Sequence, residues 1–229
     1  MHPRVPKRLV LLHIGKNHVS HGNSQCNSDS FADGGRYNSL ETALQRGREM
    51  IAEGVDIIDI GGESTRPGAQ RVSDDEELAR VIPVITELAK DGVVISIDTM
   101  RASTALAAVD VGAQIINDVS GGLADPTMLK VAAQLQLPYI AMHWRGASKD
   151  MNSRAVYGDV VHDVIHELEE RVRAALDAGL SKDNLIIDPG IGFAKDAVEA
   201  ALYRYALARG IKGYEFAGGL WRCCARCHP

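Results

Sequence analysis

Short apolar runs alternate with longer amphipathic stretches along most of the chain. Each run is rich in β-branched residues and is followed by a polar or glycine-rich turn, which is typical of buried strands. The expected strands are Leu9–Ile14, Val55–Ile60, Val93–Ile97, Gln114–Ile116, Pro138–Met142 and Leu185–Ile187. The expected helices are Ser39–Glu53, Asp74–Lys90, Ala102–Val111, Pro126–Leu135 and Val156–Ala178.

Local signals mark the ends of these helices. Ser73 precedes a run of acidic residues, and Asp125 precedes a proline that suits the first turn of a helix. Such oxygens and charges complement the free backbone amides of a helix start. Glycines stand where the helices are expected to stop, at Gly54, Gly92, Gly112 and Gly179.

Apolar strands that alternate with helices indicate a parallel sheet covered by helices. An open doubly wound sheet and a closed β/α barrel both have this pattern. No Gly-x-Gly-x-x-Gly turn follows an expected strand, which argues against a dinucleotide-binding sheet. We therefore predict an α/β protein with a TIM-type (β/α)8 barrel, incomplete because about six βα units are recognisable.

Composition narrows the class of protein further. A chain of 229 residues suits one barrel domain, and its net charge of −5 argues against a nucleic-acid partner. No apolar run approaches the roughly 20 residues of a membrane helix. The four cysteines are not spread like a disulfide framework. These features predict a cytoplasmic protein without a membrane partner.

Polar residues follow several expected strands at their carboxyl ends, where β/α barrels carry their functional groups. Asp98 ends the third strand, Asn117 the fourth and Asp188 the sixth. A buried carboxylate is unfavourable unless it is paired, so this set indicates a ligand rich in N–H donors. A pterin fits, because its amino-pyrimidinone edge can donate two hydrogen bonds to one carboxylate. Met142 and Phe193 could pack against its flat rings.

Several longer stretches occur together in a set order and spacing, and they resemble the dihydropteroate synthase family of bacterial folate biosynthesis. The resemblance covers about Asp29 to Lys195, most of the chain. Its motifs are Asp29–Gly35, Asp59–Ala69, Ser96–Thr99, Ile116–Gly122, Met142–Trp144 and Asp188–Lys195.

The resemblance implies a transferase that joins 6-hydroxymethyl-7,8-dihydropterin pyrophosphate to para-aminobenzoate with Mg²⁺, giving 7,8-dihydropteroate and pyrophosphate. It implies that Asp98, Arg66 and Lys195 take part in catalysis and that the protein is a homodimer. It makes sulfonamide sensitivity a test of the assignment. The substrate-binding residues that it implies are Ser30, Phe31, Thr65, Arg66, Asp98, Asn117, Met142, Asp188, Phe193 and Lys195.

Both ends of the chain depart from the family pattern. Gln25 stands where the family has an asparagine that binds Mg²⁺, so we expect a metal contact there on a longer side chain. After Lys195 the resemblance stops, and neither a Ser-Arg-Lys nor an Arg-x-His motif occurs in 196–229. We therefore divide the chain into an atypical segment at 1–28, a pterin-binding barrel at 29–195 and a tail at 196–229. A frame-shifted reading of the gene would explain the tail, and weak turnover is expected.

Alternatives stay open at this point. The chain could be a non-catalytic pterin-binding fragment or a methyltetrahydrofolate-type methyltransferase barrel. Asp98 and Asp188 could cap helices, and Asn117 could satisfy a turn. Met142 and Phe193 could belong to the core.

Overall fold

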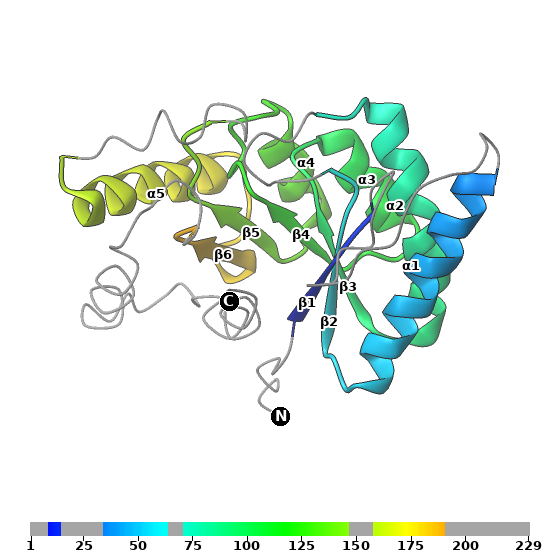
Figure 1. The fold of residues 1–229 in the computed structure, drawn as a ribbon. Helices are drawn as coiled ribbons and strands as arrows, with labels where there is room; N and C mark the ends of the chain where they lie inside the picture. Colours follow the sequence, from blue (N-terminus) through cyan, green and yellow to red (C-terminus); the bar gives the residue numbers. More distant parts are fainter. Residues whose placement is uncertain (1–8, 15–33, 64–70, 147–157, 191–229) are drawn as a thin grey trace.

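Six parallel strands form one sheet in the order in which they occur along the chain (Figure 1). The computed structural model describes residues 9–14, 34–63, 71–146 and 158–190. The strands are β1 (Leu9–His13), β2 (Ile57–Gly61), β3 (Val94–Asp98), β4 (Ile115–Asp118), β5 (Tyr139–Met142) and β6 (Leu185–Asp188). The helices are α1 (Gly34–Ala52), α2 (Asp74–Leu88), α3 (Ala102–Asp110), α4 (Met128–Leu135) and α5 (Val160–Asp177), with short 3-10 turns η1 (Ala89–Asp91) and η3 (Lys182–Asn184).

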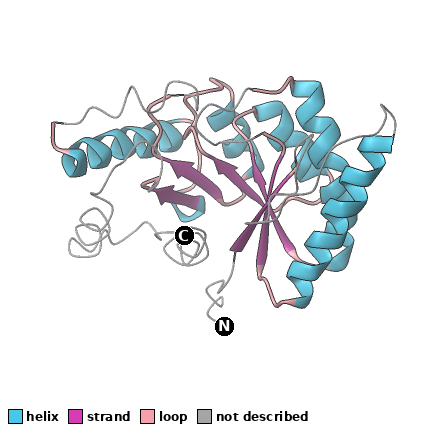
Figure 2. Cartoon of the chain, viewed as in Figure 1, coloured by secondary structure: helices cyan, strands magenta, loops and turns pink. Residues whose placement is uncertain are grey.

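Each strand pairs with the next one along the chain, and a helix connects most successive strands (Figure 2). A doubly wound sheet would reverse its strand order at one point, whereas this sheet does not. The strands therefore form the βα units of a TIM-type barrel, as predicted. Within the described residues β1 and β6 do not pair, so the sheet stays open. All of 196–229 and most of 1–28 lie outside the described residues, and the division into three segments stays a prediction.

The core lies between the sheet and its helices. Side chains alternate across a strand, so every second residue faces the helices. Ile58 and Ile60 of β2, and Ile95 and Ile97 of β3, are fully buried in one cluster with Leu88 and other residues of α2. Burying each such side chain contributes about 1.5–3 kcal/mol. The residues between them therefore point to the opposite face of the sheet, where the polar residues lie.

The predicted elements are confirmed, with shifts at some helix ends. Ser73 caps α2 by accepting a hydrogen bond from Glu76 N at 3.2 Å, and the glycines expected to end helices have positive φ. The prediction that Asp125 caps a helix starting at Pro126 is wrong. Asp125 instead accepts hydrogen bonds from Thr127, which holds a turn ahead of α4, and from Ala102 N at the start of α3. No helix among the described residues is both long and apolar enough to cross a bilayer.

Asp118 organises the turn that follows β4. Its side chain is fully buried and accepts hydrogen bonds from Ser120 N, Ser120 Oγ, Gly122 N and Tyr139 Oη at 2.6–2.8 Å. Gly122 has φ +84, and a side chain there would collide with Leu129. Burial raises the pKa of Asp118, and these hydrogen bonds oppose that shift. The residue is structural and fixes the strand end that carries Asn117.

We expect Tyr139→Phe to lower the free energy of unfolding by about 1–3 kcal/mol, because it removes a donor from a buried carboxylate. Urea denaturation measures the difference. Thr127→Val is the control, since its hydroxyl donates to an exposed acceptor and its loss should change stability by less than about 0.5 kcal/mol. Equal losses in the two variants would contradict the assigned role of Asp118.

Candidate active site

The structure brings four of the predicted site residues to one face of the sheet, at the carboxyl ends of adjacent strands. Asp98 of β3 lies in register with Asn117 of β4, and Met142 of β5 with Asp188 of β6. Asp98 is 8% exposed and Met142 3%, whereas Asn117 and Asp188 are half-buried. All four stand on the face opposite the core, by the alternation of their strands. These side chains can thus serve one ligand together.

Gly61 makes room for the Asp98 carboxylate. The two residues are in register on β2 and β3. A Cβ atom at Gly61 would lie 3.1 Å from Asp98 Oδ2, which is closer than ordinary contact. The glycine therefore leaves the carboxylate free to point across the strand ends.

Asp59 is a site residue that the sequence analysis placed only within a motif. It is 4% exposed, stands two residues before Gly61, and accepts a hydrogen bond from Asn117 Nδ2 at 2.8 Å. This bond crosses β3, on which Ser96 is in register with Asp59 and Asp98 is in register with Asn117. Asp59 could have been recognised from the sequence as an acid inside an apolar strand. A buried acid is unfavourable unless it is paired, so its position indicates a partner or a ligand.

The bond to Asp59 sets which way the Asn117 amide points. A carboxylate accepts hydrogen bonds, so the amide nitrogen faces Asp59 and the carbonyl oxygen is left for another donor. Asp59 Oδ1 and the Ser96 hydroxyl are buried, and neither has a hydrogen-bond partner within the described residues. This face of the sheet thus carries buried oxygen atoms that could accept further hydrogen bonds.

Negative charge is concentrated around Asp98. Burial raises the pKa of Asp98 well above its usual range, and the nearby carboxylates of Asp59, Glu77, Asp118 and Glu63 raise it further. Burial also raises the pKa of Asp59, with the neighbouring Ser96 and Asn117 side chains opposing that shift. Such acids are stabilised by a ligand that donates hydrogen bonds or carries positive charge.

His143 follows Met142 but has a structural partner. It is 3% exposed, and its Nε2 lies 2.9 Å from Glu167 Oε2 of α5. Arg145 also pairs with Glu167. Burial alone would raise the pKa of Glu167, yet the hydrogen bonds and charges of Arg145 and His143 hold it below its usual range. This cluster fixes α5 against the end of β5.

Several predicted site residues lie outside the described residues: Gln25, Ser30, Phe31, Thr65, Arg66, Phe193 and Lys195. Among the residues described, no group of three or more His, Cys, Asp or Glu side chains is arranged to hold a metal ion. The donor set described here therefore does not by itself fit Mg²⁺.

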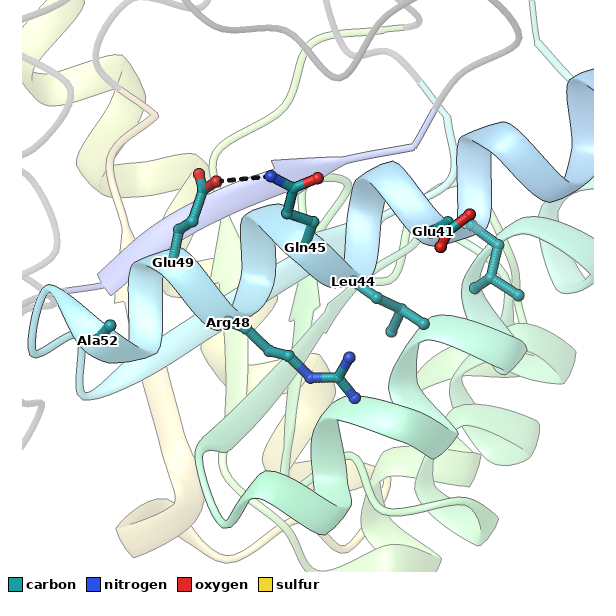
Figure 3. Close-up of a pocket in the computed structure, with 7 residues that line it drawn as sticks. Glu41, Leu44, Gln45, Arg48, Glu49 and Ala52 are labelled. Carbon is teal, nitrogen blue, oxygen red and sulfur yellow. Dashed lines mark hydrogen bonds between the residues drawn. The ribbon is translucent and has the colours of Figure 1, made fainter.

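A shallow groove along α1 is unrelated to this site. It is lined by Leu40, Leu44, Arg48, Glu49 and neighbouring residues of the same helix (Figure 3). Gln45 Nε2 donates to Glu49 Oε1 along the helix at 3.2 Å (Figure 3). None of its lining residues comes from a strand end.

The fold agrees with that of known proteins. Residues 25–222 match the family model described as pterin binding enzyme, so the chain belongs to that family. The match continues past Lys195 into the segment that the sequence analysis set apart. Within the family the chain is similar to dihydropteroate synthases.

The dihydropteroate synthase of Bacillus subtilis is 52% identical over 168 residues, 73% of this chain and 56% of that protein. The chain thus spans little more than half the length of this relative. The Yersinia pestis dihydropteroate synthase in a sulfonamide drug complex has a TM-score of 0.78 at 35% identity, covering 92% of this chain and 73% of that one. The Xanthomonas albilineans enzyme with 4-aminobenzoic acid has a TM-score of 0.77 at 38% identity, covering 93% and 72%.

We expect Asp98→Asn to stabilise the ligand-free protein at pH 7 by about 0.5–2 kcal/mol. Asp98 is harder to ionise in the folded protein than in the unfolded chain, where its pKa is about 3.9. Below that pH the carboxyl is protonated in both states and does not destabilise the fold. The destabilisation grows as the pH rises from there toward the raised pKa of the folded protein. Urea denaturation at pH 4 and pH 7 measures both variants. The gain should be larger at pH 7. Asp110→Asn, at the exposed end of α3, is the control, and an equal gain at both pH values would contradict the expectation.

Proposed function

We propose that this chain supplies the pterin-binding part of a dihydropteroate synthase. The proposed reaction condenses 6-hydroxymethyl-7,8-dihydropterin pyrophosphate with para-aminobenzoate to give 7,8-dihydropteroate and pyrophosphate. The observation that carries the proposal is the common face of Asp98, Asn117 and Asp188 in a member of the pterin-binding family. The similar enzymes complexed with 4-aminobenzoic acid and with a sulfonamide drug support the second substrate.

The geometry suits the donors of a pterin. Asp98 and Asp188 would accept hydrogen bonds from its ring N–H and amino groups, and the Asn117 carbonyl oxygen would accept one more. Met142 would supply part of an apolar wall against the rings. Because Asp59 fixes the amide of Asn117, the acceptor is oriented before the ligand arrives, which reduces the entropy lost on binding.

The same acids would favour the chemical step. The C–O bond to pyrophosphate breaks, and the aniline nitrogen forms a C–N bond to the same methylene carbon and releases a proton. If positive charge develops on the pterin methylene before attack, the buried carboxylates of Asp98 and Asp59 would stabilise it. Their interaction with that charge would be strong because both side chains are buried.

The remaining assignments follow from the family resemblance and are part of the proposal. Thr65 and Arg66 would contact the pyrophosphate and aminobenzoate, Ser30 and Phe31 the aminobenzoate. Phe193 would stack on the pterin, and Lys195 would line its pocket and take part in catalysis. A Mg²⁺ contact at Gln25 stays a prediction from the family resemblance. A homodimer and a cytoplasmic location stay predictions.

We expect Asn117→Asp to weaken binding of 6-hydroxymethylpterin pyrophosphate by about 10–100-fold, because it loses the bond to Asp59 and adds another buried acid. Isothermal titration calorimetry measures the affinity. Asn184→Asp is the matched control, since Asn184 is remote from the strand-end face and its amide donates to Gln136 O. Unchanged affinity in Asn117→Asp would rule out this pocket.

Measurements of turnover distinguish the candidate functions that remain. Incubation with both substrates should release pyrophosphate in step with dihydropteroate. Pterin binding without turnover would favour the non-catalytic fragment, and methyl transfer from methyltetrahydrofolate would favour the methyltransferase class. Absence of pterin binding would contradict the proposal as a whole.

A further inference from the structure

His143 joins the end of β5 to β6 on one side and to α5 on the other. Its backbone N–H donates to Asp188 O at 2.8 Å, one residue past the paired position of Met142 and Asp188. Its imidazole lies on the helix side of the sheet, where Nε2 is 2.9 Å from Glu167 Oε2. A single residue thus contacts both the strand that carries Asp188 and the helix that packs on the two strands.

The Glu167 carboxylate is held in one orientation by Arg145. Nε of Arg145 donates to Oε2 at 3.1 Å and Nη2 to Oε1 at 2.5 Å. Nη2 also lies 3.7 Å from Asp163 Oδ2, about one turn earlier on α5. Burial would raise the pKa of Glu167, but Arg145 and His143 lower it overall, so the carboxylate is ionised at neutral pH. An ionised carboxylate only accepts, and His143 Nε2 is therefore the donor of their hydrogen bond.

This cluster adjoins the proposed pterin site through consecutive residues. Met142 and His143 point to opposite sides of β5, because side chains alternate along a strand. Asp188 Oδ1 accepts a hydrogen bond from Gly190 N at 2.8 Å, so its carboxylate is tied to the backbone at the end of β6. A shift of one strand end against the other would therefore move an acceptor and an apolar wall of the site relative to each other.

We propose that Glu167 is a positioning residue that acts through His143 to set the ends of β5 and β6, and with them Met142 and Asp188. The proposal rests on the proposed function, because that function assigns these two residues to the pterin. Glu167 lies on the helix side of the sheet and does not contact the substrate. Binding groups have to be held to within about 0.5 Å by the residues behind them, and the buried His143 supplies such a support.

The test compares Glu167→Gln with Glu170→Gln in the full chain. Both remove one negative charge from α5 and keep the length of the side chain. Glu170 is exposed, and its Oε1 lies 3.7 Å from Nε2 of the exposed His166. The affinity for 6-hydroxymethylpterin pyrophosphate, measured by isothermal titration calorimetry, should fall about tenfold in Glu167→Gln and stay within about twofold in Glu170→Gln. Loss of a negative charge alone would strengthen binding of this anionic ligand, so the direction of the change separates positioning from electrostatics at a distance.

Variants of His143 test whether it transmits the effect. His143→Phe removes the donor and should weaken binding as much as Glu167→Gln does. His143→Gln keeps an N–H donor on the side chain and should restore the affinity to within about threefold of wild type. Adding Glu167→Gln to His143→Phe should cause no further loss, because both changes break one contact. A role in stability alone would lower Tm in each variant and leave the affinity of the folded protein unchanged.

Each outcome decides the proposal. Unchanged affinity in Glu167→Gln overturns it, as do additive losses in the double variant. If His143→Phe does not fold, Arg145→Lys takes its place. Lysine keeps the charge but lacks the planar fork that holds both oxygens of Glu167, so this variant must also weaken binding, and unchanged affinity overturns the proposal.

Amide hydrogen exchange separates this proposal from the proposed function. Exchange in peptides covering 139–145 and 185–190 should become about tenfold faster in Glu167→Gln and stay unchanged in Glu170→Gln, as expected when a local restraint is lost. If the wild-type chain does not bind the pterin pyrophosphate, the proposed function fails. The exchange comparison then still decides whether Glu167 holds the two strand ends, and equal exchange in both variants overturns that role.

Discussion

The hydrogen bond from Asn117 to Asp59 is the constraint on which the site depends. It joins β2 to β4 across β3, and neighbouring strands lie about 4.8 Å apart, so in a flat sheet the two backbones would stand nearly 10 Å from each other. The short side chains can meet because the sheet curves toward this face and Ser96 is small. Curvature of the barrel thus converts separate strand ends into one cluster of acceptors.

That cluster is unfavourable for the empty protein. Burial raises the pKa values of Asp98 and Asp59, and the neighbouring carboxylates raise that of Asp98 further. Asp118, by contrast, is equally buried but accepts four hydrogen bonds and fixes a turn. The difference separates an acid that holds the fold from the acids that we propose bind a ligand. A site that is destabilised until it binds is a recurrent arrangement in enzymes.

The acids on the helix side of the strand ends are, by contrast, paired with positively charged side chains. Glu63 and Glu77 are paired with Arg101, and Glu167 with Arg145 and His143. These networks fix the segments that follow β2, β3 and β5, whereas no cation of the described residues pairs with Asp59 or Asp98 of the opposite face in a salt bridge. Charge that is paired within the fold thus lies apart from the acids that we propose bind the ligand.

Periodicity of the sequence determined the six strands, the helices between them and the parallel fold, because apolar spacing reflects burial directly. It also placed Asp98, Asn117 and Asp188 at strand ends, where the rule for β/α barrels makes them neighbours. Asp59 and the partners of Arg101 could not be assigned in this way. Their contacts join residues 24 to 58 positions apart, so only the curvature of the sheet and the packing of α2 beside α3 decided which charges meet.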